Sequence, residues 1–467
     1  MNSDTLVLNG RRVVDLYRDR QYYQRLVRIA LPITLQNFIM STLNMVANVM
    51  IGQLGETAVA AVGLAGQIFF LLNLALFGLA SGAAIFTAQF WGNRDIPNIR
   101  RVVGISLVFS MAVGLFFWAI AIFLPETALS IYSKDEAVVA LGSQYLRIIG
   151  WAYLFFAVSI VYALALRSTG EVKVPLMVSI SALGVNILLS YGLIFGHFGL
   201  PKMGIQGAAV AALIARLLEC AILLGVTYKR RLPPAVMIKD MVGIPLSFVT
   251  KVLRRVIPVT LNEVLWSLGI TVYYIIYARI GTEAIAAMNI ASTVDMMAMV
   301  LFIGIANACA ILVGNLIGAG EEREAHRYAG RTIGLGIIGG VVMGVLIIAF
   351  SGPILSLYNV SAQVITNAEA ILRVIALFFW VRISNLIIFI GVLRSGGDTR
   401  FAFILDAGTI WVIGVPLALI GGFVLHLPVQ YVYMMAMVDE VTKAGFGVYR
   451  YFSRKWIHNL TLVVEAD

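Results

Sequence analysis

The chain contains an internal sequence repeat, and this duplication constrains its fold more than any other feature. Four residues of the first part recur at one constant offset in the numbering: Pro32 as Pro258, Gly55 as Gly281, Gly92 as Gly318 and Tyr132 as Tyr358. One residue is inserted further on, so that LRSTGE at Leu166 corresponds to LRSGGD at Leu393. A period of this length indicates two homologous domains, because stacked short repeats recur every 20 to 50 residues or so.

The duplicated units are too apolar for a water-soluble protein. Sixty per cent of the 467 residues are apolar and 12% are charged, which predicts a chain that lies in a bilayer. Apolar runs long enough to cross about 30 Å of hydrocarbon recur between short charged stretches. We predict twelve spans, six in each repeat, near residues 29–50, 58–90, 103–124, 145–166, 175–196, 206–228, 257–279, 285–314, 332–352, 371–393, 402–424 and 430–450.

Basic residues are distributed unevenly around these spans. Arg279 and Arg450 stand at the very ends of their spans and are counted with the adjoining connection and tail. The N-terminal tail, the even-numbered connections and the C-terminal tail then hold 26 of the 34 Lys and Arg residues, whereas the odd-numbered connections hold three. By the positive-inside rule, both termini should be cytoplasmic. Six spans per repeat then make the two repeats parallel, related by a pseudo-twofold axis along the membrane normal. The expected division is a basic N-terminal tail, a six-helix lobe, a cytoplasmic linker, a second six-helix lobe and a C-terminal tail, at 1–28, 29–228, 229–256, 257–450 and 451–467.

Several classes of protein are disfavoured by the same pattern. The net charge of +10 follows the membrane topology, so no nucleic-acid partner is expected. The chain has no HExxH, paired CxxC or Walker-type phosphate loop, and we predict that it is neither an enzyme nor dependent on a cofactor.

Charged residues within the spans carry the functional signal, since a carboxylate at mid-bilayer costs roughly 2.5 to 3.5 kcal/mol on insertion scales. Glu263 lies about two turns into the seventh span, with no basic residue one helical turn away. Its counterpart in the first repeat is Asn37. Only the second repeat therefore has an ionisable group here, and Glu263 is predicted to bind a cation or a proton; a protonated, hydrogen-bonded structural Glu263 is the alternative.

Two further acids, Asp295 and Asp406, are predicted to take part in binding a cation or a proton. Asp295 has Asn289 and Ser292 at helical spacing on the eighth span, and Asp406 lies on the eleventh. Oxygen-rich surroundings suit Na⁺, and a buried carboxylate can alternatively carry H⁺. A solvated or ion-paired structural role is the alternative for Asp406.

The remaining intramembrane charges have simpler explanations or alternative roles. Glu219 follows Arg216 by three residues and Glu440 precedes Lys443 by three, so these acids, together with Asp439, are interpreted as neutralised within their helices. Arg382 is either a counter-ion for an acid of the second repeat or an anion-binding group. Arg382 and Asn385, with Asn37 and Trp266, are predicted to line a substrate cavity.

The phrases LPITLQNFIMSTLNMVANVMIGQLGETAVAAVGLAG, LRSTGE, LRSGGD and IGAGEEREAHRYAG, in a six-plus-six layout, resemble the multidrug and toxic compound extrusion (MATE) family of secondary transporters. The resemblance runs over essentially the whole chain. It implies a V-shaped pair of six-helix bundles that exports organic, often cationic, compounds in exchange for inward Na⁺ or H⁺.

Only some of the family's membrane-embedded acidic residues have a match in this chain. Glu263 in PVTLNEVLW matches the seventh-helix acid of the family, and Asp295 matches an acid found in the eighth helix of some members. The first-helix acid of many members falls on Ala47, and the tenth-helix acid of some falls on Ile383, so both are absent here. The resemblance therefore favours cation coupling in the second lobe, and Glu263 and Asp295 with their polar neighbours favour Na⁺ over H⁺.

These observations predict a multi-pass protein of the plasma (inner) membrane that acts as a monomer and exports organic cations by alternating access. The alternative is a lipid-linked oligosaccharide flippase of related fold. A flippase must hold a pyrophosphate and should line its cavity with several Arg or Lys, whereas most intramembrane basic residues here have simpler explanations.

Overall fold

The computed structural model describes residues 19–465, and its regular secondary structure is helical throughout that range. Most of the predicted tail at 1–28 lies outside the described residues, but its end, from Arg20, is already part of the first helix. The elements are α2 (Arg20–Gly52), α3 (Glu56–Gly92), α4 (Ile96–Phe123), α5 (Pro125–Ser130), α6 (Glu136–Ser168), α7 (Lys173–Phe195), α8 (Ile205–Lys229), α9 (Ile238–Met241), α10 (Leu246–Ile280), α11 (Thr282–Gly318), α12 (Glu322–Leu355), α13 (Ala362–Leu386), η1 (Ile387–Arg394), α14 (Thr399–Thr409), η2 (Ile410–Gly414), α15 (Val415–Leu419), η3 (Ile420–Val424), α16 (Val429–Ala436), α17 (Val438–Phe452) and α18 (Leu460–Glu465).

Within this range, eleven helices are long and apolar enough to cross a membrane. They correspond to the first eleven predicted spans. The last predicted span is divided between α16 and α17, which meet at Met437. Asp439, Glu440 and Lys443 lie in α17 and make that stretch more polar than the others.

Local sequence explains where several helices begin and end. The side chains of Asp19, Asp95 and Asp135 accept hydrogen bonds from first-turn amides of α2, α4 and α6. An oxygen acceptor at this position satisfies amides that have no partner inside the helix. Gly196 ends α7 in the left-handed region, at φ +79°, where a side chain would be strained. Short polar connections therefore separate long apolar helices.

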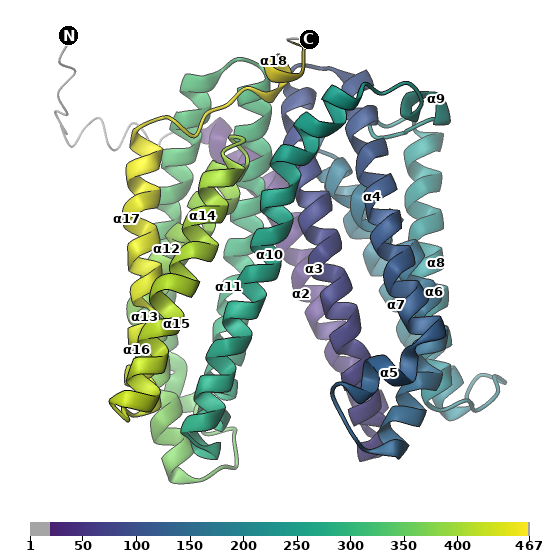
Figure 1. The fold of residues 1–467 in the computed structure, drawn as a ribbon, viewed down its shortest axis with the longest axis vertical. Coiled ribbons are helices and arrows are strands. Elements are labelled where there is room, and N and C mark those ends of the chain that lie inside the picture. Colours follow the sequence, from purple (N-terminus) through teal and green to yellow (C-terminus); the bar gives the residue numbers. More distant parts are fainter. Residues whose placement is uncertain (1–18, 466–467) are drawn as a thin grey trace.

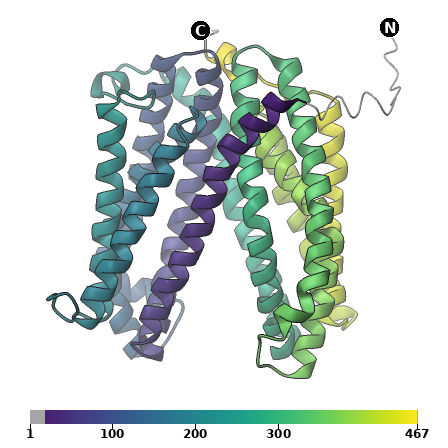
Figure 2. The same cartoon turned by 180° about the vertical axis from the view of Figure 1, so that it is seen from behind.

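The helices gather in two halves that form a V (Figures 1 and 2). Helices α2 to α8 make one half and α10 to α17 the other. The halves converge at the end where α2 begins and α18 lies, which is the end of the described termini, and they diverge at the opposite end, near α5 and α16. Contacts across the V are made by α3 with α10 and α11, and by α2 with α11.

Glycine contacts at the closed end follow the internal repeat. Gly78 lies against Thr260 and Gly304 lies against Thr34, and the members of one pair are the repeat counterparts of the members of the other. Nearer the termini, a Cβ on Gly92 would overlap the Asn315 carbonyl oxygen, and one on Gly318 would overlap the Gln89 carbonyl oxygen. Small residues let membrane helices approach this closely, so these glycines set the distance between the halves.

The C-terminal segment also crosses the closed end. The Leu460 amide donates to the Gln89 Oε1 on α3 at 2.7 Å. The Gln89 Nε2 donates to the Ser395 carbonyl oxygen at 2.9 Å. Gln89 thus joins the first half to two segments of the second.

A π-helical turn lies where the two repeats differ in length. Arg147 and Arg373 keep the offset that relates the earlier pairs of the repeat, whereas Leu166 and Leu393 are one position further apart, so the inserted residue falls between Arg373 and Leu393. Segment η1 begins within that interval, continues α13 and ends one residue beyond it, at Arg394. A π turn holds one more residue between donor and acceptor than an α turn, and such turns occur inside α-helices, often at functional sites. The insertion is absorbed there without breaking the helix.

Candidate functional site

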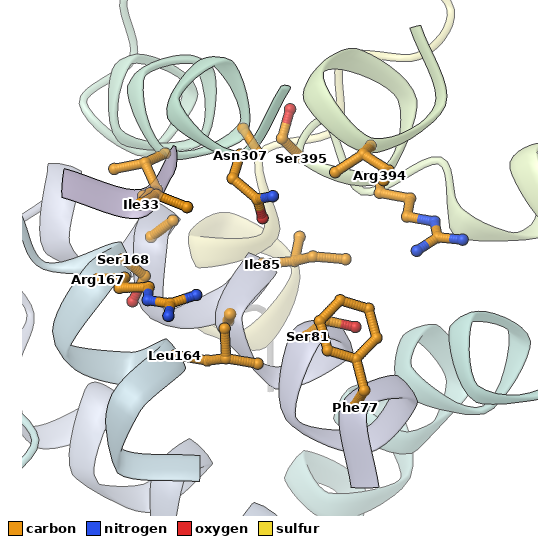
Figure 3. A pocket seen from close by; sticks show the side chains of 15 residues that line it. Ile33, Phe77, Ser81, Ile85, Leu164, Arg167, Ser168, Asn307, Arg394 and Ser395 are labelled. Carbon is orange, nitrogen blue, oxygen red and sulfur yellow. The ribbon is translucent and has the colours of Figure 1, made fainter. Parts of the chain in front are cut away.

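A pocket lies between the two halves of the V (Figure 3). Its walls come from α2, α3 and α6 of the first half and from α11 and η1 of the second. Its cavity volume is about 70 Å³, and the pocket is partly open to solvent. Most lining residues are apolar. Six lining residues have polar side chains: Ser81, Arg167, Ser168, Asn307, Arg394 and Ser395.

The two arginines occupy equivalent positions in the repeats, in LRSTGE and LRSGGD. The Arg394 Nη1 donates to the Glu263 Oε1 at 2.6 Å, and both side chains are largely buried. The Arg167 Nη2 donates instead to the uncharged Gln36 Oε1 at 2.7 Å. Within the described range, no carboxylate lies within ion-pair distance of Arg167, and its buried Nε has no hydrogen-bond partner. The two halves thus present the same side chain to the pocket with different net charge.

A polar chain extends from each of these positions into its own half. In the first half, the Gln36 Nε2 donates to the Ser179 Oγ at 2.9 Å. Ser179 in turn donates to the Glu219 Oε1 at 2.9 Å. The Glu219 Oε2 pairs with the Arg216 Nη1 at 2.7 Å, which confirms the predicted pair within that helix. The first-half chain therefore ends in a neutralised acid.

The second half repeats this arrangement with charged groups. Asn262, the counterpart of Gln36, donates through Nδ2 to the Asp406 Oδ2 at 2.9 Å. Asp406 is the counterpart of Ser179 once the inserted residue is counted. Its Oδ1 lies 3.1 Å from the Lys443 Nζ. A serine hydroxyl of the first half is thus a carboxylate in the second.

Lys443 is the centre of a buried cluster on α14 and α17. Besides Asp406, its Nζ lies 3.2 Å from both the Asp439 Oδ2 and the Glu440 Oε1, and Lys443 is 1% exposed. The predicted Glu440–Lys443 pair is confirmed, and Asp439 and Asp406 join it. The Asn385 Nδ2 donates to the Glu440 Oε2 at 2.6 Å. Removing one partner from a buried ion pair leaves an uncompensated charge and costs about 3–5 kcal/mol, so Lys443 holds this part of the lobe together.

Asp295 forms a separate ion pair. Arg382 donates to it through both terminal nitrogens, from Nη1 to Oδ1 at 2.5 Å and from Nη2 to Oδ2 at 3.0 Å. Of the two roles considered for Arg382, the geometry corresponds to that of a counter-ion. Asn289 is exposed, and its carbonyl oxygen accepts the hydroxyls of Ser292 and Thr293.

The structure does not bring the predicted sodium ligands together. Glu263 pairs with Arg394, and Asp295 pairs with Arg382. The two arginines lie twelve residues apart along one span, or roughly 18 Å at 1.5 Å per residue. Over residues 19–465, no group of three His, Cys, Asp or Glu side chains is arranged to hold a metal ion.

The residues predicted to line a substrate cavity lie elsewhere than this pocket. Asn37 is half-buried beside Gln36, Trp266 is 39% exposed on α10, and Arg382 and Asn385 contact acids inside the second half. Arg167 and Arg394 were missed because each lies at the end of a predicted span and was counted with a connection. Their equivalent positions in the repeated LRS phrase were the available signal.

An all-helical membrane chain with a repeated polar framework and a pocket between its halves is built as a transporter. The sequence model of the MatE family matches residues 32–192 and 258–420, one match in each half, and the chain belongs to this family of multidrug and toxic compound extrusion (MATE) transporters. The prediction that the chain is not an enzyme is confirmed by this membership.

Relatives and solved structures agree with the assignment. A probable multidrug resistance protein NorM of Thermotoga maritima is 25% identical over 444 residues, which cover 95% of each chain. Another of that name, from Rhizobium meliloti, is 31% identical over 78% of this chain and 79% of its own length. A solved multidrug resistance MATE transporter of the MOP superfamily, described as outward-facing, superposes with a TM-score of 0.80 at 21% identity and covers 95% of this chain and 98% of its own. That likeness shows the fold.

Proposed function

We propose that the protein exports small organic compounds by alternating access, driven by a cation that moves inwards and binds at Glu263. The relatives named as multidrug resistance proteins support the export of organic compounds. The observation that carries the coupling is the Glu263–Arg394 ion pair, because one of its members is ionisable within the membrane and the other lines the pocket between the halves.

The ion pair gives a direct link between cation and pocket. While Glu263 is charged, it holds the Arg394 guanidinium. A cation on Glu263 neutralises that charge and weakens its attraction for Arg394, whose side chain can then change its position at the pocket wall. Cation and substrate each bias the equilibrium between conformations only through their different affinities for them.

The geometry favours H⁺ as the coupling ion, in place of the Na⁺ favoured by the sequence. Sodium requires several oxygen ligands at one point, and the two acids expected to supply them lie in separate ion pairs. A single proton on Glu263 is sufficient to remove the charge that holds Arg394. Asp295 and Asp406 are then part of the charged framework of the second half.

The ion is tested with purified protein in liposomes loaded with a fluorescent dye. We expect an inward proton gradient without sodium to drive export, and a sodium gradient at fixed pH to leave the dye near its equilibrium distribution. The measurement is dye release over time. Export that follows only the sodium gradient would overturn proton coupling at Glu263.

The topology proposed with this function has twelve spans, in lobes 29–228 and 257–450 around the 229–256 linker, with both tails in the cytoplasm of a monomer in the plasma membrane. The V then opens to the outside, because its open end lies opposite the termini (Figure 1). The asymmetry of the basic residues supports this orientation.

Orientation is tested with single cysteines in cells. Lys239→Cys, in α9, should react only with reagents that enter the cytoplasm, and Lys134→Cys, after α5, should react from outside, since both side chains are exposed. The native Cys220 and Cys309 are buried and serve as the background control. Labelling of both new cysteines from one side would exclude the twelve-span topology.

Whether the pocket suits an organic cation or the pyrophosphate of a flippase substrate depends on its charge. No acidic side chain is among the residues that line it, and two arginines are. The two arginines are the one observation in favour of a flippase. Since Glu263 neutralises Arg394, only Arg167 is left for a ligand, which is less than a pyrophosphate needs.

A further inference from the structure

We infer that Arg167 forms an anion-binding subsite in the pocket between the halves, and that the compounds the protein carries include apolar molecules with one carboxylate or sulfonate group. This inference rests on the proposed transport function and names its substrate class. Its basis is the contrast between Arg167 and Arg394 at equivalent positions.

The first half has an excess of positive charge in its buried polar framework. Arg216 is neutralised by Glu219 at 2.7 Å, and the nearest partner of Arg167 is the neutral amide of Gln36. In the second half the equivalent Arg394 has its carboxylate, Glu263. A partly buried cation is costly without a partner. The carboxylate that acts on Arg167 from within its own half is Glu219, which is already paired with Arg216, and among the described residues no carboxylate lies within ion-pair distance of Arg167, so its guanidinium can take a further anion.

The surroundings hold Arg167 in place and leave donors free. Gln36 is fixed by its hydrogen bond to Ser179, and its oxygen is directed at Arg167. A guanidinium has five N–H donors, and the described contacts of Arg167 use only its Nη2. Planar carboxylates and related groups bind such a donor set in bidentate fashion. Arg167 is therefore preorganised for one anionic group.

The remaining walls suit the apolar body of such a molecule. Figure 3 shows Arg167 beside Leu164, with Ile33 and Ile85 around it and Arg394 on the far side of the pocket. The lining has only a few uncharged polar groups, among them Asn307 from α11. Among the described lining residues, Arg167 is the cation without a carboxylate in ion-pair distance, and its position among apolar side chains fits a monoanion with an aromatic or aliphatic body.

The test compares two probes of the same shape and opposite charge, 1-naphthalenesulfonate and 1-naphthylmethylammonium. Binding to the full-length protein in zwitterionic lipid nanodiscs is measured by calorimetry, so that the readout does not depend on coupling. We expect wild type to prefer the sulfonate. Arg167→Gln should weaken sulfonate binding by about tenfold or more and leave the ammonium probe unchanged, because a charge-assisted bond is lost.

Two further variants separate binding from structure. Arg167→Lys keeps the charge without the planar donor set and should retain part of the affinity. Arg147→Gln makes the same change on the same helix, at an exposed residue paired with Glu126, and should match wild type. Elution as a single folded species checks each variant. A wild type that prefers the ammonium probe, or an Arg167→Gln variant that binds sulfonate as wild type does, would overturn the subsite.

Two further measurements are added. The first shows whether the bound anion is a lipid headgroup, and the second shows whether a negative result contradicts the substrate class or the transport function. If phosphatidylglycerol in the nanodisc abolishes sulfonate binding, the subsite belongs to a lipid headgroup and the substrate inference is overturned. Transport of the same probes is then measured in liposomes. Export of the ammonium probe alone contradicts the anionic substrate class and leaves transport standing, whereas sulfonate binding without gradient-driven movement of either probe supports the subsite and contradicts the proposed function.

Discussion

Glu263→Gln is expected to reduce gradient-driven export strongly and to leave the folded protein intact. The amide keeps the size of the side chain and can still accept a hydrogen bond from Arg394, but it cannot bind a proton or carry a charge. Coupling free energies of about 1–3 kcal/mol correspond to affinity changes of roughly 5- to 150-fold. We therefore expect the rate of gradient-driven export to decrease by a factor of this size. The measurement is dye export from liposomes under a proton gradient.

The control for this variant is its counterpart in the first repeat. Asn37→Ala changes a half-buried amide that does not line the pocket and should reduce the rate much less. Expression level and elution profile show whether each variant is folded. Export at the wild-type rate by Glu263→Gln would move the coupling site elsewhere, and Asp295 would be the next residue to change.

Gly92→Ala and Gly318→Ala are expected to open the end of the V that holds the termini. In each case the new methyl group would overlap a backbone carbonyl oxygen of the facing helix, which cannot turn away as a flexible side chain can. Overpacking of this kind costs about 1–3 kcal/mol, and it acts only on the conformation in which α3 and α11 are this close. The population should therefore shift towards conformations that are open at this end.

Spin labels at Asn93→Cys and Glu321→Cys report this change, because both side chains are exposed just beyond the two glycines. The distance distribution between them should gain a longer component in either variant. Gly63→Ala is the matched control, since it lies on α3 with open space around its Cβ position. An unchanged distribution in both alanine variants would show that these glycines do not set the closed state.

The sequence was a good guide to the fold and a poorer guide to the site. Apolar length identified the helices, and the predicted span at 332–352 lies inside α12, because membrane-crossing segments have a fixed minimum length. Two helices continue past the predicted ends of their apolar runs at 166 and 393: α6 ends at Ser168 and η1 at Arg394. Residues assigned to connections thus became part of the pocket wall.

The partners of the acids could not be predicted for a different reason. Glu263 and Arg394 are 131 residues apart, and Asp295 and Arg382 are 87 apart, so each contact depends on which helices adjoin. Helical spacing gives neighbours one turn away only, which is why the pairs within α8 and α17 were predicted correctly. For the same reason the sequence could not show whether Glu263 and Asp295 adjoin, and the structure places them in separate ion pairs.

The π turn in η1 allows the tenth span to lose one residue without a large rotation of the helix beyond it. In an α-helix each residue turns the chain by about 100°, so adding or removing one residue normally rotates everything beyond it onto another face. A turn that already stores an extra residue can lose it and return to α-helical bonding with little rotation beyond it. Arg394 thus keeps its place on the pocket wall although the two halves differ in length.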